Sequence, residues 1–86
     1  MPLSRIIEKL NKYTDRLMRG KDSKIKASHV EKVMAKLERR EANLLEQIAD
    51  EDNPERRTRL NKRLRVNRKQ AERARWLLKQ LSPERN

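Results

Sequence analysis

The chain has no cysteine and no phenylalanine, and it has one glycine, one tryptophan and one tyrosine among 86 residues. The absence of cysteine excludes a disulfide framework and thiolate metal sites. No apolar stretch approaches the ~18 residues that a transmembrane helix needs. The N-terminal segment MPLSRIIEKL also lacks the uninterrupted apolar run of a signal peptide. We therefore expect a cytoplasmic protein that does not enter a membrane.

Large apolar residues are scarce, because charged residues make up 43% of the chain. This composition approaches that of disordered proteins. The apolar residues nevertheless recur at helical spacing, which favours a helical assembly with a narrow core. Residues 1–86 are enough for a single small domain at most, and self-association would bury more apolar surface. The expected fold class is all-α, as a homodimer or another homo-oligomer.

A short first helix is expected over residues 4–19, followed by a polar linker over residues 20–27. Its apolar stripe repeats at spacings of three and four residues and consists of Leu3, Ile6, Leu10, Tyr13 and Leu17. Gly20 follows the last apolar residue, where a residue without Cβ can adopt the left-handed conformation of a helix C-terminal cap. The sequence does not indicate where this helix docks.

Two longer helices are expected over residues 28–51 and 54–81, with a tail over residues 82–86. Ser28 and Glu31 have the spacing of a capping box, which predicts the start of the second helix. Asn53 suits an N-cap and Pro54 the first helical position, which predicts the start of the third. Since both helices share a heptad-like register across a tight turn, they predict a coiled-coil-like antiparallel hairpin.

Two polar residues, Glu41 and Asn67, interrupt the apolar seams of this hairpin. Folding the chain about residues 52 and 53 places Glu41 near Leu64 and Leu37 near Asn67 or Arg68. A polar residue in such a seam often fixes the register or the oligomeric state. Local hydration of the hairpin is the alternative, and the sequence does not separate the two.

The third helix carries most of the charge of the protein. Residues 54–81 hold eleven Lys and Arg against two Glu, which gives +9 of the total +11. Eight of these eleven bases are Arg, which favours bidentate contacts with phosphates. Charge concentrated on one element is typical of polyanion binders. We therefore expect this helix to bind DNA or RNA through Arg56, Arg59, Lys62, Arg63, Arg65, Arg68, Lys69, Arg73, Lys79 and Trp76.

Within that set, Arg65, Arg68, Lys69 and Arg73 are expected to face outward, away from most acids of the second helix. Trp76 projects nearly opposite the apolar seam. It could stack on a base or anchor a protein partner. The favoured interpretation is that Val66, Trp76 and Leu77 form a second stripe, covered by the first helix or by another subunit.

Catalysis has little support in the sequence. There is one histidine, His29, and no Gly-rich phosphate loop or cluster of His and carboxylates, so we expect no enzyme, cofactor or metal. The acidic run at residues 50–52 lacks the ligand spacing of a calcium loop and fits a solvated turn better. No helix-turn-helix, zinc-finger or RNP pattern is present. The alternative function is a protein interaction module, an adaptor, assembly factor or regulator, whose basic helix binds an acidic protein partner.

Overall fold

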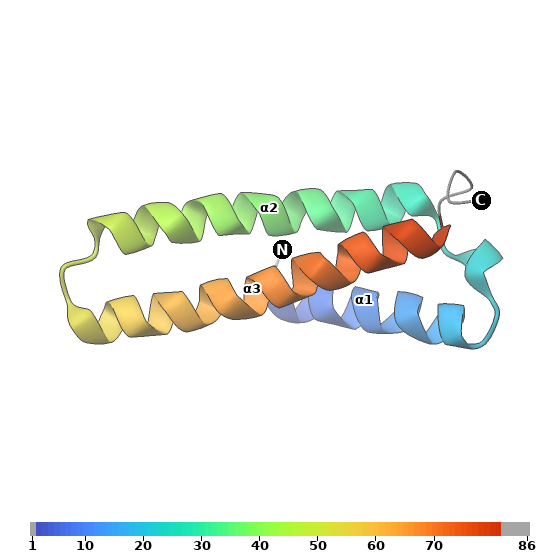
Figure 1. The fold of residues 1–86 in the computed structure, drawn as a ribbon, viewed down its shortest axis with the longest axis horizontal. Coiled ribbons are helices and arrows are strands. Elements are labelled where there is room, and N and C mark those ends of the chain that lie inside the picture. The colour runs from blue at the N-terminus through green and yellow to red at the C-terminus, as the bar shows by residue number, and fades with distance from the viewer. Residues whose placement is uncertain (1, 82–86) are drawn as a thin grey trace.

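The computed structural model describes residues 2–81, and that range contains three α-helices and a short 3-10 helix but no strand. The helices are α1 (Leu3–Met18), α2 (Ala27–Asp50) and α3 (Pro54–Leu81), and the 3-10 helix η1 (Asp22–Lys24) lies between α1 and α2. Figure 1 shows α2 and α3 side by side and antiparallel, with α1 beside the half of the hairpin farthest from its turn. The prediction of an all-α helical hairpin is confirmed.

The turn between α2 and α3 is held by the side chains that the sequence indicated. The Asn53 Oδ1 accepts hydrogen bonds from the backbone N–H of Glu55 at 2.9 Å and of Arg56 at 3.3 Å. Pro54 is the first residue of α3, where its missing N–H leaves no helical bond unmade. The Glu51 carboxylate accepts a bond from the Asn53 N–H at 3.2 Å, so an acid of the 50–52 run contributes to the turn.

The end of α1 has the expected glycine cap. Gly20 has a φ of +71°, in the left-handed region. Its N–H donates to the Leu17 carbonyl at 3.1 Å, and the Lys21 N–H donates to the Arg16 carbonyl at 2.7 Å. These two bonds form a Schellman motif, which satisfies carbonyls that the helix leaves open.

The predicted start of α2 is wrong. The helix begins at Ala27 with Lys26 as its N-cap, and no side chain caps it, so Ser28 lies inside the helix. The polar linker is also wrong in part, because η1 lies within it and Ile25 is buried with only 6% exposed. Burying Ile25 outweighs the ~1 kcal/mol that a side-chain N-cap contributes, and the docked residue sets where the helix starts.

The interior divides into two apolar clusters along the length of the hairpin. The larger cluster lies where three helices meet, and its buried residues are Ile6, Leu10, Tyr13, Ile25, Val30, Val33, Leu37, Ala71, Ala74 and Leu77. The smaller cluster lies toward the turn, where α2 and α3 pack alone, and consists of Leu44, Leu60 and Leu64 with Ile48 beside them. The molecule measures 47 × 22 × 18 Å, so its core is long and narrow.

A polar layer separates these clusters, at the level where Glu41 and Asn67 interrupt the two seams. Asn67 is fully buried, and its Nδ2 donates to the Leu37 carbonyl at 2.8 Å. The Asn67 Oδ1 is buried and has no hydrogen-bond partner among residues 2–81. Beside it, Arg68 on α3 pairs with Glu41 on α2 at 3.5 Å. The predicted proximity of Leu37 to Asn67 is confirmed.

The docking of α1 changes which face of α3 is buried. Leu77 is fully buried, whereas the next residue, Leu78, is only partly buried. On the same side of α3, the Arg73 Nη2 donates to the Thr14 Oγ1 of α1 at 3.2 Å. Because α1 packs beside the seam between α2 and α3, the buried stripe of α3 is turned toward α1. No helix among residues 2–81 is long and apolar enough to cross a bilayer.

Candidate nucleic-acid interface

A row of three bases runs along the solvent side of α3. Lys62, Arg65 and Lys69 are all exposed, and none has an ion pair or side-chain hydrogen bond with another described residue. Their spacing of three and four residues keeps them on one face of the helix and spans about 10 Å at 1.5 Å per residue. We call Lys62, Arg65 and Lys69 the α3 row.

The α3 row borders a broad, open depression on the surface of the helix. The depression has a volume of about 670 Å³ and is lined by Thr58, Asn61, Lys62, Leu64, Arg65, Arg68, Lys69 and Glu72. Its lining contains four bases and one acid, so the local charge is strongly positive. A shallow basic surface suits the backbone of a polymer better than a small ligand that needs enclosure.

Two of the four arginines and lysines expected to face outward do not do so freely. Arg68 is half exposed but directs its guanidinium to the Glu41 carboxylate, so it does not lie away from this acid of α2, although the expectation was only that it lies away from most of them. Arg73 is partly buried and bonded to Thr14 of α1. The reason is tertiary in both cases: Glu41 sits in the seam beside Arg68, and α1 docks over Arg73.

The bases nearest the turn lie in a surface of mixed sign. Arg56, Arg59 and Arg63 are exposed and line a hollow of about 450 Å³ together with Asp50 and Glu51. Acids within the same hollow reduce the positive potential there. Lys79 is exposed near the other end of α3. The structure thus spreads the predicted site residues along the whole helix, and Lys62, Arg65 and Lys69 lie among them in one exposed row.

Of the three residues in the expected second stripe, Trp76 is 41% exposed and Val66 is 42% exposed, whereas Leu77 is fully buried. The favoured interpretation of a covered second stripe therefore holds for Leu77 and is wrong for Trp76 within one chain. Because α1 does not cover it, the indole remains accessible to a partner. Its coverage by a second subunit stays a prediction.

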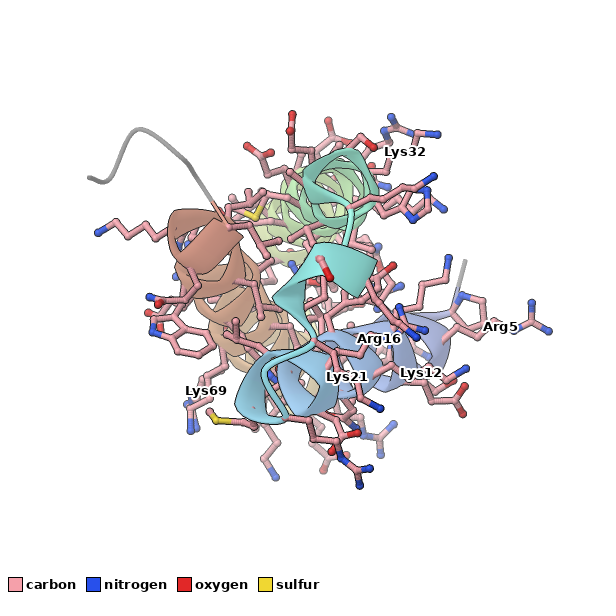
Figure 2. The ribbon with its side chains drawn as sticks, turned by 90° about the vertical axis from the view of Figure 1, so that its right-hand side faces the viewer. Arg5, Lys12, Arg16, Lys21, Lys32 and Lys69 are labelled. Carbon is pink, nitrogen blue, oxygen red and sulfur yellow. The ribbon has the colours of Figure 1, made fainter. Side chains whose placement is uncertain are left out.

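Sequence reasoning missed a second group of bases, on α1 and α2. These bases are Arg5, Lys9 and Lys12 on α1 and Lys32 on α2. Figure 2 shows Arg5, Lys12 and Lys32 on its right-hand side. The signal in the sequence is the spacing of four and three residues between the bases of α1. This spacing alone does not show that the bases of α1 share a surface with Lys32, which depends on how α1 packs beside α2.

Family models, curated proteins and solved structures were all compared with this chain, and none matches it.

Proposed function

We propose that this chain is a non-enzymatic nucleic-acid-binding protein that contacts the phosphate backbone through the outer face of α3. The observation that carries the proposal is the α3 row: three exposed bases without partners on a helix of net charge +9. Exposed charges of one sign repel one another when no anion is present, and phosphates relieve that repulsion. Arginine also matches a phosphate with two parallel hydrogen bonds.

The packing of α3 favours binding without base readout. A major groove is ~12 Å wide and admits a single helix, whereas the bundle is 22 × 18 Å across. With α2 and α1 packed on it, α3 has only its outer face available, and the exposed bases of the α3 row on that face match phosphates. We therefore expect affinity to depend little on sequence.

The test replaces the α3 row: Lys62→Gln, Arg65→Gln and Lys69→Gln together. If all three contact duplex phosphates, the slope of log K against log salt becomes shallower by about 2.7, and affinity at 0.1 M salt falls by roughly two to three orders of magnitude. Helicity and thermal stability should change little, because exposed charges contribute little to folding. Fluorescence anisotropy on a labelled duplex over a salt series measures the effect.

The matched control removes the same charge elsewhere. Lys21, Lys24 and Lys26 are exposed in the connection between α1 and α2, and their replacement by Gln should lower affinity much less than the α3-row variant does. Equal losses in the two variants would mean that net charge alone drives binding, and the α3 row would not be a site. Unchanged binding in the α3-row variant would reject the proposal.

The alternative function is a protein interaction module, such as an adaptor, assembly factor or regulator, with the same helix against an acidic protein. The exposure of Trp76 beside basic residues favours it, because Trp and Arg are enriched at interface hot spots. A pull-down with and without nuclease separates the two functions, since a protein partner survives nuclease treatment. The cytoplasmic location belongs to the same proposal, and cell fractionation tests it.

Self-association is also part of this proposal. Leu45, Val66 and Trp76 remain 41–43% exposed on the surface of a small domain, and a homodimer would cover such residues. Sedimentation at micromolar concentration decides it, and a monomer there would reject the homodimer.

A further inference from the structure

A second basic surface lies where α1 and α2 meet. Arg5, Lys9 and Lys12 follow one side of α1 at spacings of four and three residues, and all three are exposed. Figure 2 shows Arg5, Lys12 and Lys32 pointing to one side of the molecule and Lys69 pointing to another. We call Arg5, Lys9, Lys12 and Lys32 the α1–α2 face.

A groove between the two helices forms the centre of this face. It has a volume of about 240 Å³ and is lined by Lys9, Tyr13, His29, Lys32, Val33 and Lys36. Tyr13 and Val33 are buried, at 8% and 3% exposed, and close the floor of the groove. No acid lines it, in contrast to the hollow at the hairpin turn, where Asp50 and Glu51 accompany the arginines.

The charges of α2 are divided between its two flanks, which explains the composition of the groove. Glu41 faces α3, where it pairs with Arg68, and the helical period places Glu38 and Glu31, three and ten residues before it, on the same side of α2. His29, Lys32 and Lys36 occupy the opposite flank, against α1. Lys9 is brought to these bases by the docking of α1. Like charges held close together repel one another, and an anion in the groove relieves that repulsion.

We propose that the α1–α2 face is a second phosphate-binding surface, so that one chain holds two segments of nucleic acid at once. This inference rests on the proposed function of α3. The two surfaces lie on different sides of a bundle that is 22 × 18 Å across. Bending one duplex, whose persistence length is ~150 bp, around both sides of such a body costs deformation energy that two separate segments do not incur. Each surface therefore takes its own segment, and the chain bridges them.

The test is a bridging assay with two duplexes of unrelated sequence. One duplex is fixed to beads, the other is labelled in solution, and the chain is added at the concentration that saturates the fixed duplex. The variant Arg5→Gln, Lys9→Gln, Lys32→Gln should bind a single duplex within about threefold of the unaltered chain, because the α3 row is intact. It should capture at least tenfold less of the second duplex. The Lys21→Gln, Lys24→Gln, Lys26→Gln control has the same net charge and should bridge normally.

The outcomes separate this inference from the proposed function. A chain that binds no duplex rejects both. A chain that binds one duplex but captures no second, or a groove variant that bridges as well as the unaltered chain, rejects the second surface alone. Equal loss of bridging in the groove variant and in the control also rejects it, because bridging would then depend on the net charge of the chain and not on the position of the bases. A thermal melt of each variant confirms that it is folded, and arms with duplex DNA and duplex RNA identify the polymer.

Discussion

Replacing Asn67 by Leu should stabilise this protein, although it removes a buried hydrogen bond. Asn67 is fully buried, donates to the Leu37 carbonyl at 2.8 Å and leaves its own Oδ1 without a partner. It separates the cluster around Leu44 from the larger cluster. A leucine there would join the two clusters into one continuous core. The Leu37 carbonyl lies inside α2, where the helix's own hydrogen bonding serves it.

The expected gain follows from four contributions. Removal of the unpartnered oxygen gains about 2 kcal/mol, and loss of the hydrogen bond costs about 1 kcal/mol. Burial of the apolar side chain gains about 2 kcal/mol, and the greater volume costs about 2 kcal/mol in strain. The sum is a stabilisation of about 1 kcal/mol, which raises the Tm of a domain of this size by about 4–8 °C.

Thermal and urea unfolding followed by circular dichroism measure this change. Asn67→Val, which is smaller, tests whether strain hides the gain, and Asn67→Asp keeps the shape while placing a charge against the Leu37 carbonyl. The Asp variant should lose about 3–5 kcal/mol, as expected for a buried charge without a counterion. Loss of stability in both the Leu and the Val variants would refute the account of Asn67 as a costly polar residue. If Asn67 fixes the register, the Leu variant should also show mixed oligomeric states in sedimentation.

Two further substitutions test the turn and the exposed indole. Asn53→Ala removes the acceptor for two backbone N–H groups at the start of α3 and should cost about 0.5–2 kcal/mol by urea denaturation; no change would mean that Pro54 alone sets the helix start. Trp76→Ala should cost less than the ~3 kcal/mol of a buried aromatic residue, because the side chain is 41% exposed. If the indole stacks on a base, the same variant should lose ~1–3 kcal/mol of affinity for single-stranded nucleic acid, and unchanged affinity would assign it to another partner.

The helices and the hairpin could be predicted from the sequence because their determinants are local. The seam spacing, the Asn53–Pro54 pair and Gly20 each act within a turn of helix. The predicted start of α2 was wrong because its determinant is not local to that turn of helix. Ile25 is buried by contacts with distant residues, and no pattern in residues 20–31 distinguishes a docked isoleucine from a solvated one.

The candidate site was predicted at the level of the helix and not of the residue. The charge of α3 is visible in the sequence, and so is the outer position of Arg65 and Lys69. Arg68 forms an ion pair with Glu41, and Arg73 donates a hydrogen bond to Thr14. These two contacts depend on the rotation of α3 and on where α1 docks. A helical wheel gives the direction of a side chain but not the neighbour that it meets.

The docking of α1 therefore determines which basic residues of this chain share a surface. It packs beside Leu77, which is fully buried, and it engages Arg73, so that this base is no longer free on the surface of α3. It also brings Lys9 beside the basic flank of α2 and creates a groove without acids. One packing event thus removes charge from one side of the bundle and concentrates charge on another. A chain with scattered bases on every helix becomes a body with two separate basic surfaces, and its binding should respond to which surface is altered more than to how much charge is removed.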